Sequence, residues 1–258
     1  MTTPPRFLEG APCWAGLSTP DVAGARRFYG GLLGWTFDDP IRELAGYINI
    51  RRHGQLIAGM TGPMPGVESP PAWAVWLKSS DVEASGRAAV AAGGSVMYPP
   101  HDVADLGRML LLTDPTGAVV GLWQPRAHAG SQLWDVPGAP CWAELYTRDG
   151  RAADRFYRAL FDYEQHPSPA DCGVDYSMYT VGERPVAGRL QMTDAWPGVP
   201  PHWLIYFAVD DLTAALRRAG ELGGDVVHGP MDSPHGPNAF LKDPYGAIFA
   251  VIQRAANT

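Results

Sequence analysis

The feature that most constrains this chain is an internal repeat. Residues 12–35, which begin Pro-Cys-Trp-Ala, return without a gap as residues 140–163, at an offset of 128 residues. A fixed long period sets the architecture before any single residue is interpreted, because each copy must fold as the same unit. Three further motifs recur in the same order: Pro-Pro-x-Trp at 70–73 and 200–203, Gly-Gly at 93–94 and 223–224, and Asp-Pro-x-Gly-Ala at 114–118 and 243–247.

The repeat predicts two homologous domains joined by a linker. The stretch between the copies is rich in proline, glycine and serine, which is typical of a connecting segment. Each domain spans 115 residues, which is long enough for a core of its own. We expect a lead-in with little structure at 1–11, a first domain at 12–126, a linker at 127–139, a second domain at 140–254 and a tail at 255–258.

Within each domain, hydrophobic periodicity predicts a strand, a helix and further strands, in that order and twice over. The helices of the first domain are expected to begin after Asp21 and Asp81, whose side chains suit an N-cap. The second domain repeats this with Asp149 and Asp211. Each domain therefore holds two βαβββ units. The first-domain strands are expected at 12–19, 45–52, 55–60, 72–79, 95–98, 107–113 and 118–123, with a connector at 61–71.

Charge and composition exclude several classes of partner. The formal net charge is −7, so no basic surface for nucleic acid is expected. No apolar run approaches the roughly 18 residues of a membrane span, and the N-terminus lacks the pattern of a signal peptide. We therefore expect a cytoplasmic protein that contacts neither nucleic acid nor membrane, as a monomer or a homodimer.

The ordered motifs, present twice, resemble the vicinal-oxygen-chelate superfamily, which includes glyoxalases, extradiol dioxygenases and fosfomycin- and bleomycin-resistance proteins. The resemblance covers residues 12–125 and 140–254, and it is most similar to a tandem, glyoxalase-like actinobacterial branch often labelled "hydroxylase". It implies an α+β fold of two tandem domains, each of two βαβββ units that form a half-open barrel around a cavity.

The resemblance also implies where a metal would be held. Metal-dependent members place His, Gln or Glu side chains at inward-facing strand positions, which suits a Lewis acid with open coordination sites. None of the six corresponding residues in this chain can bind a metal, so we expect neither a metal nor another cofactor. These six positions are Trp14, Ala74 and Gly121 in the first domain, and Trp142, Leu204 and Ala250 in the second.

Two polar residues stand near the vacant ligand positions of the second domain. Glu144 replaces Gly16 of the first copy, and His202 replaces Ala72. If both face one cavity, Glu144 as base and His202 as acid or orienting donor would be chemically sensible, with Tyr206 on the same face. The alternative is a solvated pair at the strand ends. The other histidines are expected in turns, loops or the linker at the surface: His53, His101, His128, His166, His228 and His235.

Aromatic residues are expected to wall this cavity. Strand alternation places Trp142 and Tyr146 on the face of Glu144, and Leu204 on the face of His202. A wall of Trp and Tyr suits a flat, largely apolar ligand, although the rings could instead fill a barrel core. The remaining expected binding residues are Trp14, Tyr47, Trp123, Tyr176 and Ala250.

The sequence therefore favours a metal-independent protein that binds an aromatic or polyketide-like metabolite and transforms it by acid–base chemistry of the isomerase, cyclase or lyase type. No nucleophile or phosphate-binding motif supports other chemistry. One alternative is a resistance protein that sequesters such a compound without catalysis. The second is a divalent-metal enzyme like a glyoxalase or dioxygenase.

Overall fold

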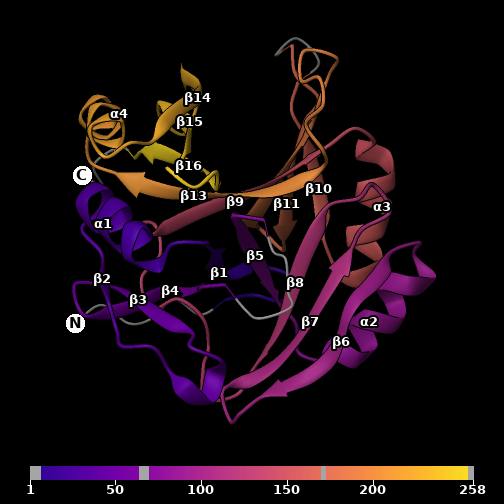
Figure 1. Ribbon diagram of the computed structural model, residues 1–258. Coiled ribbons are helices and arrows are strands. Elements are labelled where there is room, and N and C mark those ends of the chain that lie inside the picture. The colour runs from indigo at the N-terminus through magenta and orange to yellow at the C-terminus, as the bar shows by residue number, and fades with distance from the viewer. Residues whose placement is uncertain (1–6, 64–69, 170–172, 255–258) are drawn as a thin grey trace.

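The computed structural model describes residues 7–63, 70–169 and 173–254. It contains two eight-stranded sheets, one in each half of the chain (Figure 1). The expected α+β architecture of two tandem domains is confirmed. The tail at 255–258, residues 1–6 of the lead-in and part of the first connector lie outside the described residues, and the remaining domain boundaries stay predictions.

The first sheet has the strand order β2-β3-β4-β1-β5-β8-β7-β6. Its centre is the antiparallel pair β1 and β5, which joins the two βαβββ units, and the register places Gly16 opposite Ala74. The strands are β1 (Pro12–Ser18), β2 (Thr36–Phe37), β3 (Ile48–Arg52), β4 (Gln55–Thr61), β5 (Ala72–Lys78), β6 (Ser95–Val103), β7 (Gly107–Thr113) and β8 (Val119–Pro125). The helices are α1 (Val22–Leu33), η1 (Arg42–Leu44) and α2 (Val82–Ala91).

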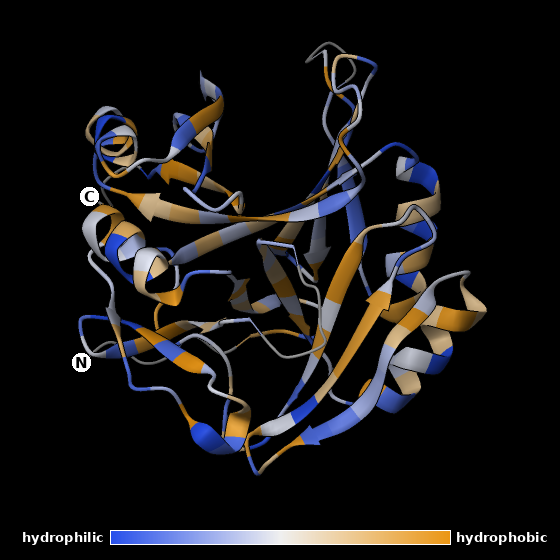
Figure 2. Cartoon of the chain, viewed as in Figure 1, coloured by the Kyte–Doolittle hydropathy of each residue, from blue (hydrophilic) through white to orange (hydrophobic). Residues whose placement is uncertain are grey.

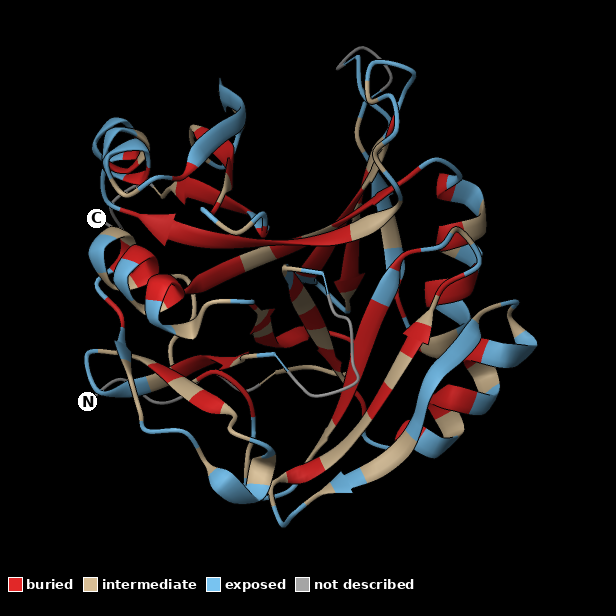
Figure 3. Ribbon diagram, in the orientation of Figure 1, coloured by how far each residue is buried: buried red, intermediate tan, exposed pale blue. Residues whose placement is uncertain are grey.

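The second sheet repeats this topology in the order β10-β11-β12-β9-β13-β16-β15-β14. The central strand β13 is buried along almost its whole length, whereas the edge strand β14 is exposed (Figure 3). The strands are β9 (Pro140–Thr147), β10 (Glu164–Pro167), β11 (Tyr176–Val181), β12 (Arg184–Gln191), β13 (His202–Val209), β14 (Asp225–Met231), β15 (Asn238–Lys242) and β16 (Ile248–Gln253). The helices are α3 (Gly150–Leu160) and α4 (Leu212–Glu221).

The predicted caps explain where the helices begin. Asp21, Asp81, Asp149 and Asp211 each accept a hydrogen bond of 2.9 Å from the backbone N–H three residues later. Each carboxylate thereby satisfies a donor that has no partner inside the helix. The strand expected at 95–98 was too short, because β6 continues to Val103. As an edge strand it tolerates two prolines that would break a central one.

The repeated Gly-Gly motif has a packing cause in each of its two positions. Gly93 adopts a φ of 90°, which favours glycine after a helix. A Cβ on Gly94 would lie 2.6 Å from the Phe156 ring of the other domain. The pair at 223–224 repeats both features, with Phe28 pressing on the second glycine. The motif therefore leaves room in each domain for a phenylalanine side chain of the other domain.

Both domains share one hydrophobic core, which includes buried residues from each sheet and from the helices. Helix α1 lies beside α4 and α2 beside α3, so each helix of one domain faces a helix of the other (Figure 1). Apolar residues run along strands such as β7, while hydrophilic residues mark the outer turns of α3 and α4 (Figure 2). None of the helices in the described part of the chain is long and apolar enough to cross a membrane.

Buried hydrogen bonds join the domains at this core. The Tyr29 hydroxyl donates to Asp243 Oδ2 of the second domain at 3.0 Å and accepts from Trp73 Nε1 at 2.9 Å. The equivalent residues of the repeat form the same arrangement with the two domains exchanged. Tyr157 donates to Asp114 Oδ2 of the first domain at 3.1 Å and accepts from Trp203 Nε1 at 2.8 Å. The chain thus forms two equivalent bridges between its halves.

We predict that Tyr157→Phe lowers the free energy of unfolding by about 2 kcal/mol or more, because it leaves the buried Trp203 N–H and Asp114 Oδ2 without this partner. Urea unfolding of the variant and the parent protein measures the change. The matched control is Tyr98→Phe, since that side chain is 59% exposed. Equal stability of Tyr157→Phe and the parent would contradict the proposed importance of the bridge.

Candidate functional site

The candidate site lies on the face of the second sheet where β9 and β13 pair at its centre. The antiparallel register sets Trp142 opposite Tyr206, Glu144 opposite Leu204 and Tyr146 opposite His202. Because directly paired residues project to the same side of a sheet, these six side chains share one face. Most of the residues expected from sequence at the second-domain site are therefore neighbours.

The Glu144 carboxylate is the centre of this group. Its Oε1 accepts from Trp142 Nε1 and from the Tyr176 hydroxyl, both at 3.1 Å. Its Oε2 accepts from the hydroxyls of Tyr146 at 2.9 Å and Tyr206 at 2.7 Å. An ionised carboxylate has about four lone-pair sites, so these four donors fill its capacity. The solvated strand-end alternative therefore does not describe Glu144, which is half-buried within an aromatic cluster.

Two of these phenols also contact each other. The hydroxyl oxygens of Tyr146 and Tyr206 lie 2.8 Å apart, so with Glu144 Oε2 they form a triangle of three short contacts. Burial, and then the Glu144 charge, raises the pKa of both phenols well above the usual value, so both remain protonated. Two phenolic protons cannot fill three contacts. The triangle is therefore one proton short of a hydrogen for each of its three contacts.

His202 is connected to this triangle through Tyr146. The two rings are stacked with centroids 5.3 Å apart and planes within 8°. The His202 Nδ1 lies 2.9 Å from the Pro200 carbonyl oxygen, which can only accept, so Nδ1 carries the hydrogen of the neutral ring. Burial lowers the pKa of His202, and the bond to Pro200 opposes this. The neutral ring therefore offers Nε2 as an acceptor.

A segment between β12 and β13 covers this end of the site. Its Trp196 ring lies 5.7 Å from that of Tyr146. The segment is fastened by the Arg148 guanidinium, which donates to the carbonyls of Thr193 at 3.3 Å and Val199 at 3.1 Å, and also to that of Trp196. This segment is the counterpart of the connector predicted at 61–71 in the first domain, and a segment without periodicity gives no sign of what it covers.

The floor of the site is apolar. Leu204 and Ala250 are almost fully buried in the cluster that also contains Tyr206. Neither side chain carries a donor atom for a metal, and the indole N–H of Trp142 is directed at Glu144. In the described residues, no group of three or more His, Cys, Asp or Glu side chains could hold a metal ion. The donor set of this chain does not fit the divalent ion of metal-dependent relatives.

The first domain arranges its matching residues differently. Trp14 Nε1 donates to the Tyr47 hydroxyl at 2.8 Å, in the place where Trp142 of the second domain reaches its glutamate. Trp14 and Trp123 are only 7% and 8% exposed. The structure thus places Trp14 and Trp123 in a buried cluster with the Tyr47 hydroxyl bonded to Trp14, and a binding role for these three residues stays a prediction.

The linker packs against this cluster of the first domain. His128 packs edge-on against Trp14, with centroids 4.4 Å apart, and its carbonyl accepts from Trp123 Nε1 at 2.8 Å. Further along, Gln132 exchanges two hydrogen bonds with the backbone of Leu56, each 2.7 Å long. The expectation that His128 lies at the surface holds only in part, since its ring is half-buried against Trp14 and burial lowers its pKa to about 4. A single sequence gives no signal that a linker folds back over its own domain.

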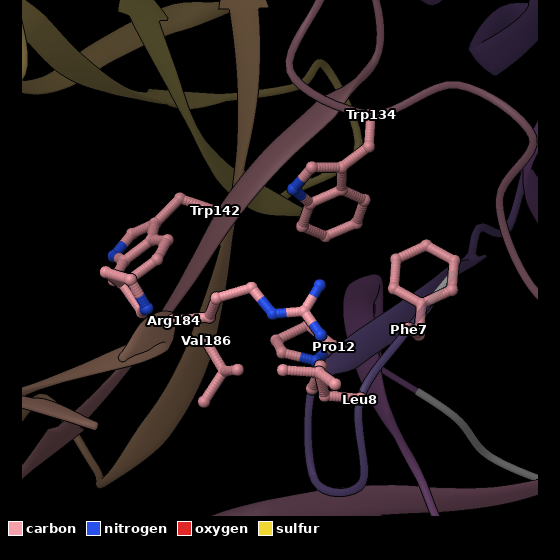
Figure 4. Close-up of a pocket in the computed structure, with 9 residues that line it drawn as sticks. Phe7, Leu8, Pro12, Trp134, Trp142, Arg184 and Val186 are labelled. Atoms are coloured by element: carbon pink, nitrogen blue, oxygen red, sulfur yellow. The ribbon is translucent and has the colours of Figure 1, made fainter. Parts of the chain in front are cut away.

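A small cavity of about 170 Å³ opens beside Trp142 in the second domain (Figure 4). Its other walls come from β12, from Pro12 at the start of β1, and from the lead-in and the linker, and they include Phe7, Trp134 and Arg184. The described end of the lead-in forms no helix or strand, in keeping with the expectation, but it is held in place. That end is fastened where the Gly10 carbonyl accepts from the Tyr163 hydroxyl at 2.6 Å.

Comparisons with known proteins agree with this architecture. Residues 13–122 match the glyoxalase/bleomycin resistance protein/dioxygenase superfamily, and residues 142–252 match the family described as a glyoxalase-like domain. The chain is 38% identical to the putative glyoxylase CFP32 of Mycobacterium tuberculosis over 254 residues, covering 96% of this chain and 97% of that protein. The chain belongs to the glyoxalase/bleomycin resistance protein/dioxygenase superfamily.

Other similar proteins carry names that describe different activities. This superfamily member is 39% identical over 269 residues to the anthracycline biosynthesis protein DnrV of Streptomyces peucetius, covering 96% of this chain and 94% of that protein. Among solved structures, the 2,3-dioxygenase LapB from Pseudomonas sp. KL28 aligns with a TM-score of 0.66 at 13% identity, covering 95% of this chain and 93% of that one. The Mn(II)-bound glyoxalase from Novosphingobium aromaticivorans aligns with a TM-score of 0.65 at 17% identity, covering 95% and 83%. At such identities the structural likeness concerns the fold alone.

We predict that stability falls as the pH drops from about 6.5 to about 4, in part through His128. Because its folded pKa lies near 4, below the usual 6.5, the unfolded chain binds a proton in this range that the folded chain does not. His128→Gln should reduce the decrease by about 2 kcal/mol. Urea unfolding across this pH range measures it, with His235→Gln at an exposed histidine as the control. An unchanged pH profile in His128→Gln would refute the assignment.

Proposed function

We propose that the second domain binds an aromatic, polyketide-type metabolite and transforms it by proton transfer without a metal ion, as an isomerase, cyclase or lyase would. The observation that carries this proposal is the triangle of Glu144, Tyr146 and Tyr206, which is one proton short. The printed name of the Streptomyces peucetius relative, an anthracycline biosynthesis protein, supports the polyketide class of ligand.

In the proposed reaction, Glu144 removes a proton from a carbon next to a substrate carbonyl. The electron pair of the broken C–H bond forms a C=C bond to the carbonyl carbon, and the π pair of the carbonyl moves to its oxygen. A hydroxyl of Tyr146 or Tyr206 turns from Glu144 to donate to the enolate oxygen formed there. Both phenols keep their protons at neutral pH because burial raises their pKa. Return of the proton to a different atom gives an isomer, and loss of a leaving group gives an elimination product.

His202 would serve as the second proton-handling group in this scheme. Its Nδ1 hydrogen is held by the Pro200 carbonyl, so its ring orientation and tautomer are fixed. The lowered pKa keeps the ring neutral, with Nε2 able to accept a proton from the substrate. Tyr146 is stacked on His202 and hydrogen-bonded to Glu144. In this scheme it separates the two proton-handling groups, so that each contacts a different part of the ligand.

Binding without catalysis is the second candidate function. It is favoured by the four donors that already occupy the lone-pair sites of Glu144, since a ligand would have to displace one of them to reach the carboxylate. In that case the protein would sequester an aromatic compound, as a resistance protein does. A cytoplasmic location, and a monomeric or homodimeric state, remain predictions from the sequence.

We predict that Glu144→Gln lowers turnover by about 10²- to 10⁴-fold, because the amide cannot take up the proton. The substrate is sought by mass spectrometry of a metabolite extract incubated with substoichiometric protein, and initial rates are then compared. The exposed Glu43→Gln variant is the matched control. A chelator should leave the rate unchanged.

The outcomes separate the candidates. Full turnover by Glu144→Gln would refute its catalytic role. Loss of activity with a chelator, restored by a divalent metal, would favour the metalloenzyme alternative instead. Retention of an unaltered compound by the parent protein, with no conversion beyond the amount of protein, would establish sequestration.

A further inference from the structure

The geometry points to an anion-binding subsite beside Glu144, the candidate catalytic residue. In this subsite Arg184 binds a negatively charged substituent on an aromatic ring of the ligand. The site is the cavity of about 170 Å³ next to Trp142. Its ligand would be a benzoate-like group: a single aromatic ring that carries a carboxylate or a comparably acidic substituent. This inference rests on the proposed function in one respect: it takes the acidic ring in the cavity to be part of the substrate that Glu144 acts on.

The charge requirement comes from Arg184, the first residue of β12. Its guanidinium extends into the cavity between Trp134 and Pro12, with Phe7 nearby (Figure 4). Within the described part of the chain, no hydrogen bond or ion pair engages it. By contrast, Arg189 further along the same strand binds Asp154 and Asp175. An arginine fork that faces a cavity without a carboxylate partner suits an anionic ligand.

The shape requirement comes from the volume and the rings. A cavity of about 150 Å³ is large enough for benzene, so this one has room for a single six-membered ring. Trp134 and Phe7 meet edge-to-face at 5.4 Å and fix one wall, while Trp142 forms another. Aromatic walls favour a planar ring. Among planar rings, the Arg184 guanidinium favours those that carry a negative charge.

The position of Trp142 joins the subsite to the reacting group. Its ring lines the cavity while its Nε1 donates to Glu144 Oε1 at 3.1 Å. A substrate with an acidic ring in the cavity would therefore place its remaining part near the Glu144 carboxylate. Arg184 would act in specificity and positioning rather than in the chemical step.

The first domain lacks both the arginine and the open cavity. The strand register sets Gly59 opposite Gly16 and Gly188 opposite Glu144, so Gln55 of β4 corresponds to Arg184. The corresponding space is occupied by the linker, where Ser131 donates its N–H to the Cys13 carbonyl at 2.8 Å. The cation and the open volume thus occur together in the second domain.

The test compares benzoate with benzamide, which has nearly the same shape and no charge. Titrations follow the tryptophan fluorescence, because Trp134 and Trp142 line the cavity. We expect the parent protein to bind benzoate about tenfold or more tighter than benzamide, with the preference decreasing at high salt. Arg184→Gln should remove the preference and leave the benzamide affinity unchanged. Arg151→Gln, at an exposed arginine of α3, is the matched control and should keep the preference.

Glu144→Gln keeps this test apart from that of the proposed function. The amide oxygen can still accept from Trp142, so the benzoate preference should survive even where turnover is lost. A preference in this variant that depends on Arg184 establishes the subsite, whether or not the protein proves to be an enzyme. Absence of measurable benzoate binding, equal affinity for both probes, or an unchanged preference in Arg184→Gln would overturn the inference.

Discussion

The rest of the structure depends on the paired bridges between Tyr29 and Asp243 and between Tyr157 and Asp114. Each phenol both donates to a carboxylate of the other domain and accepts from a buried indole, inside a core shared by the two halves. A polar network that is fully satisfied in a desolvated core holds one arrangement, because any displacement leaves unpaired groups. With one face of each sheet engaged in this core, the opposite face is left for the cavities.

The repeat made most of the fold predictable. Capping carboxylates such as Asp21 and stop signals such as Gly34 acted through local hydrogen bonds and backbone conformation, which the sequence expresses directly. The errors occurred where the partner is distant in sequence. The length of β6 depends on pairing with β7, and the order of the described lead-in residues depends on Tyr163, more than 150 positions away. Neither contact leaves a periodic signal.

The candidate site was predictable for the same reason and to the same extent. Strand alternation placed Glu144, Tyr146 and Tyr206 on one face, because register along a strand is a local property. What alternation could not supply was the number of donors on the carboxylate, or the arrival of Trp196 and Arg184 from other segments. Those features follow from tertiary packing. They decide between a solvated glutamate and a half-buried one held by four donors, which is the distinction on which the proposed chemistry depends.

The folded-back linker changes what the duplication means for binding. His128 and its neighbours are covalently attached to the cavity that they fill, so they compete with any free molecule at the high effective concentration of an intramolecular ligand. Two similar domains therefore do not give two equivalent sites. Under the proposed function, the stoichiometry expected of this chain is one ligand per molecule, without cooperativity between the halves.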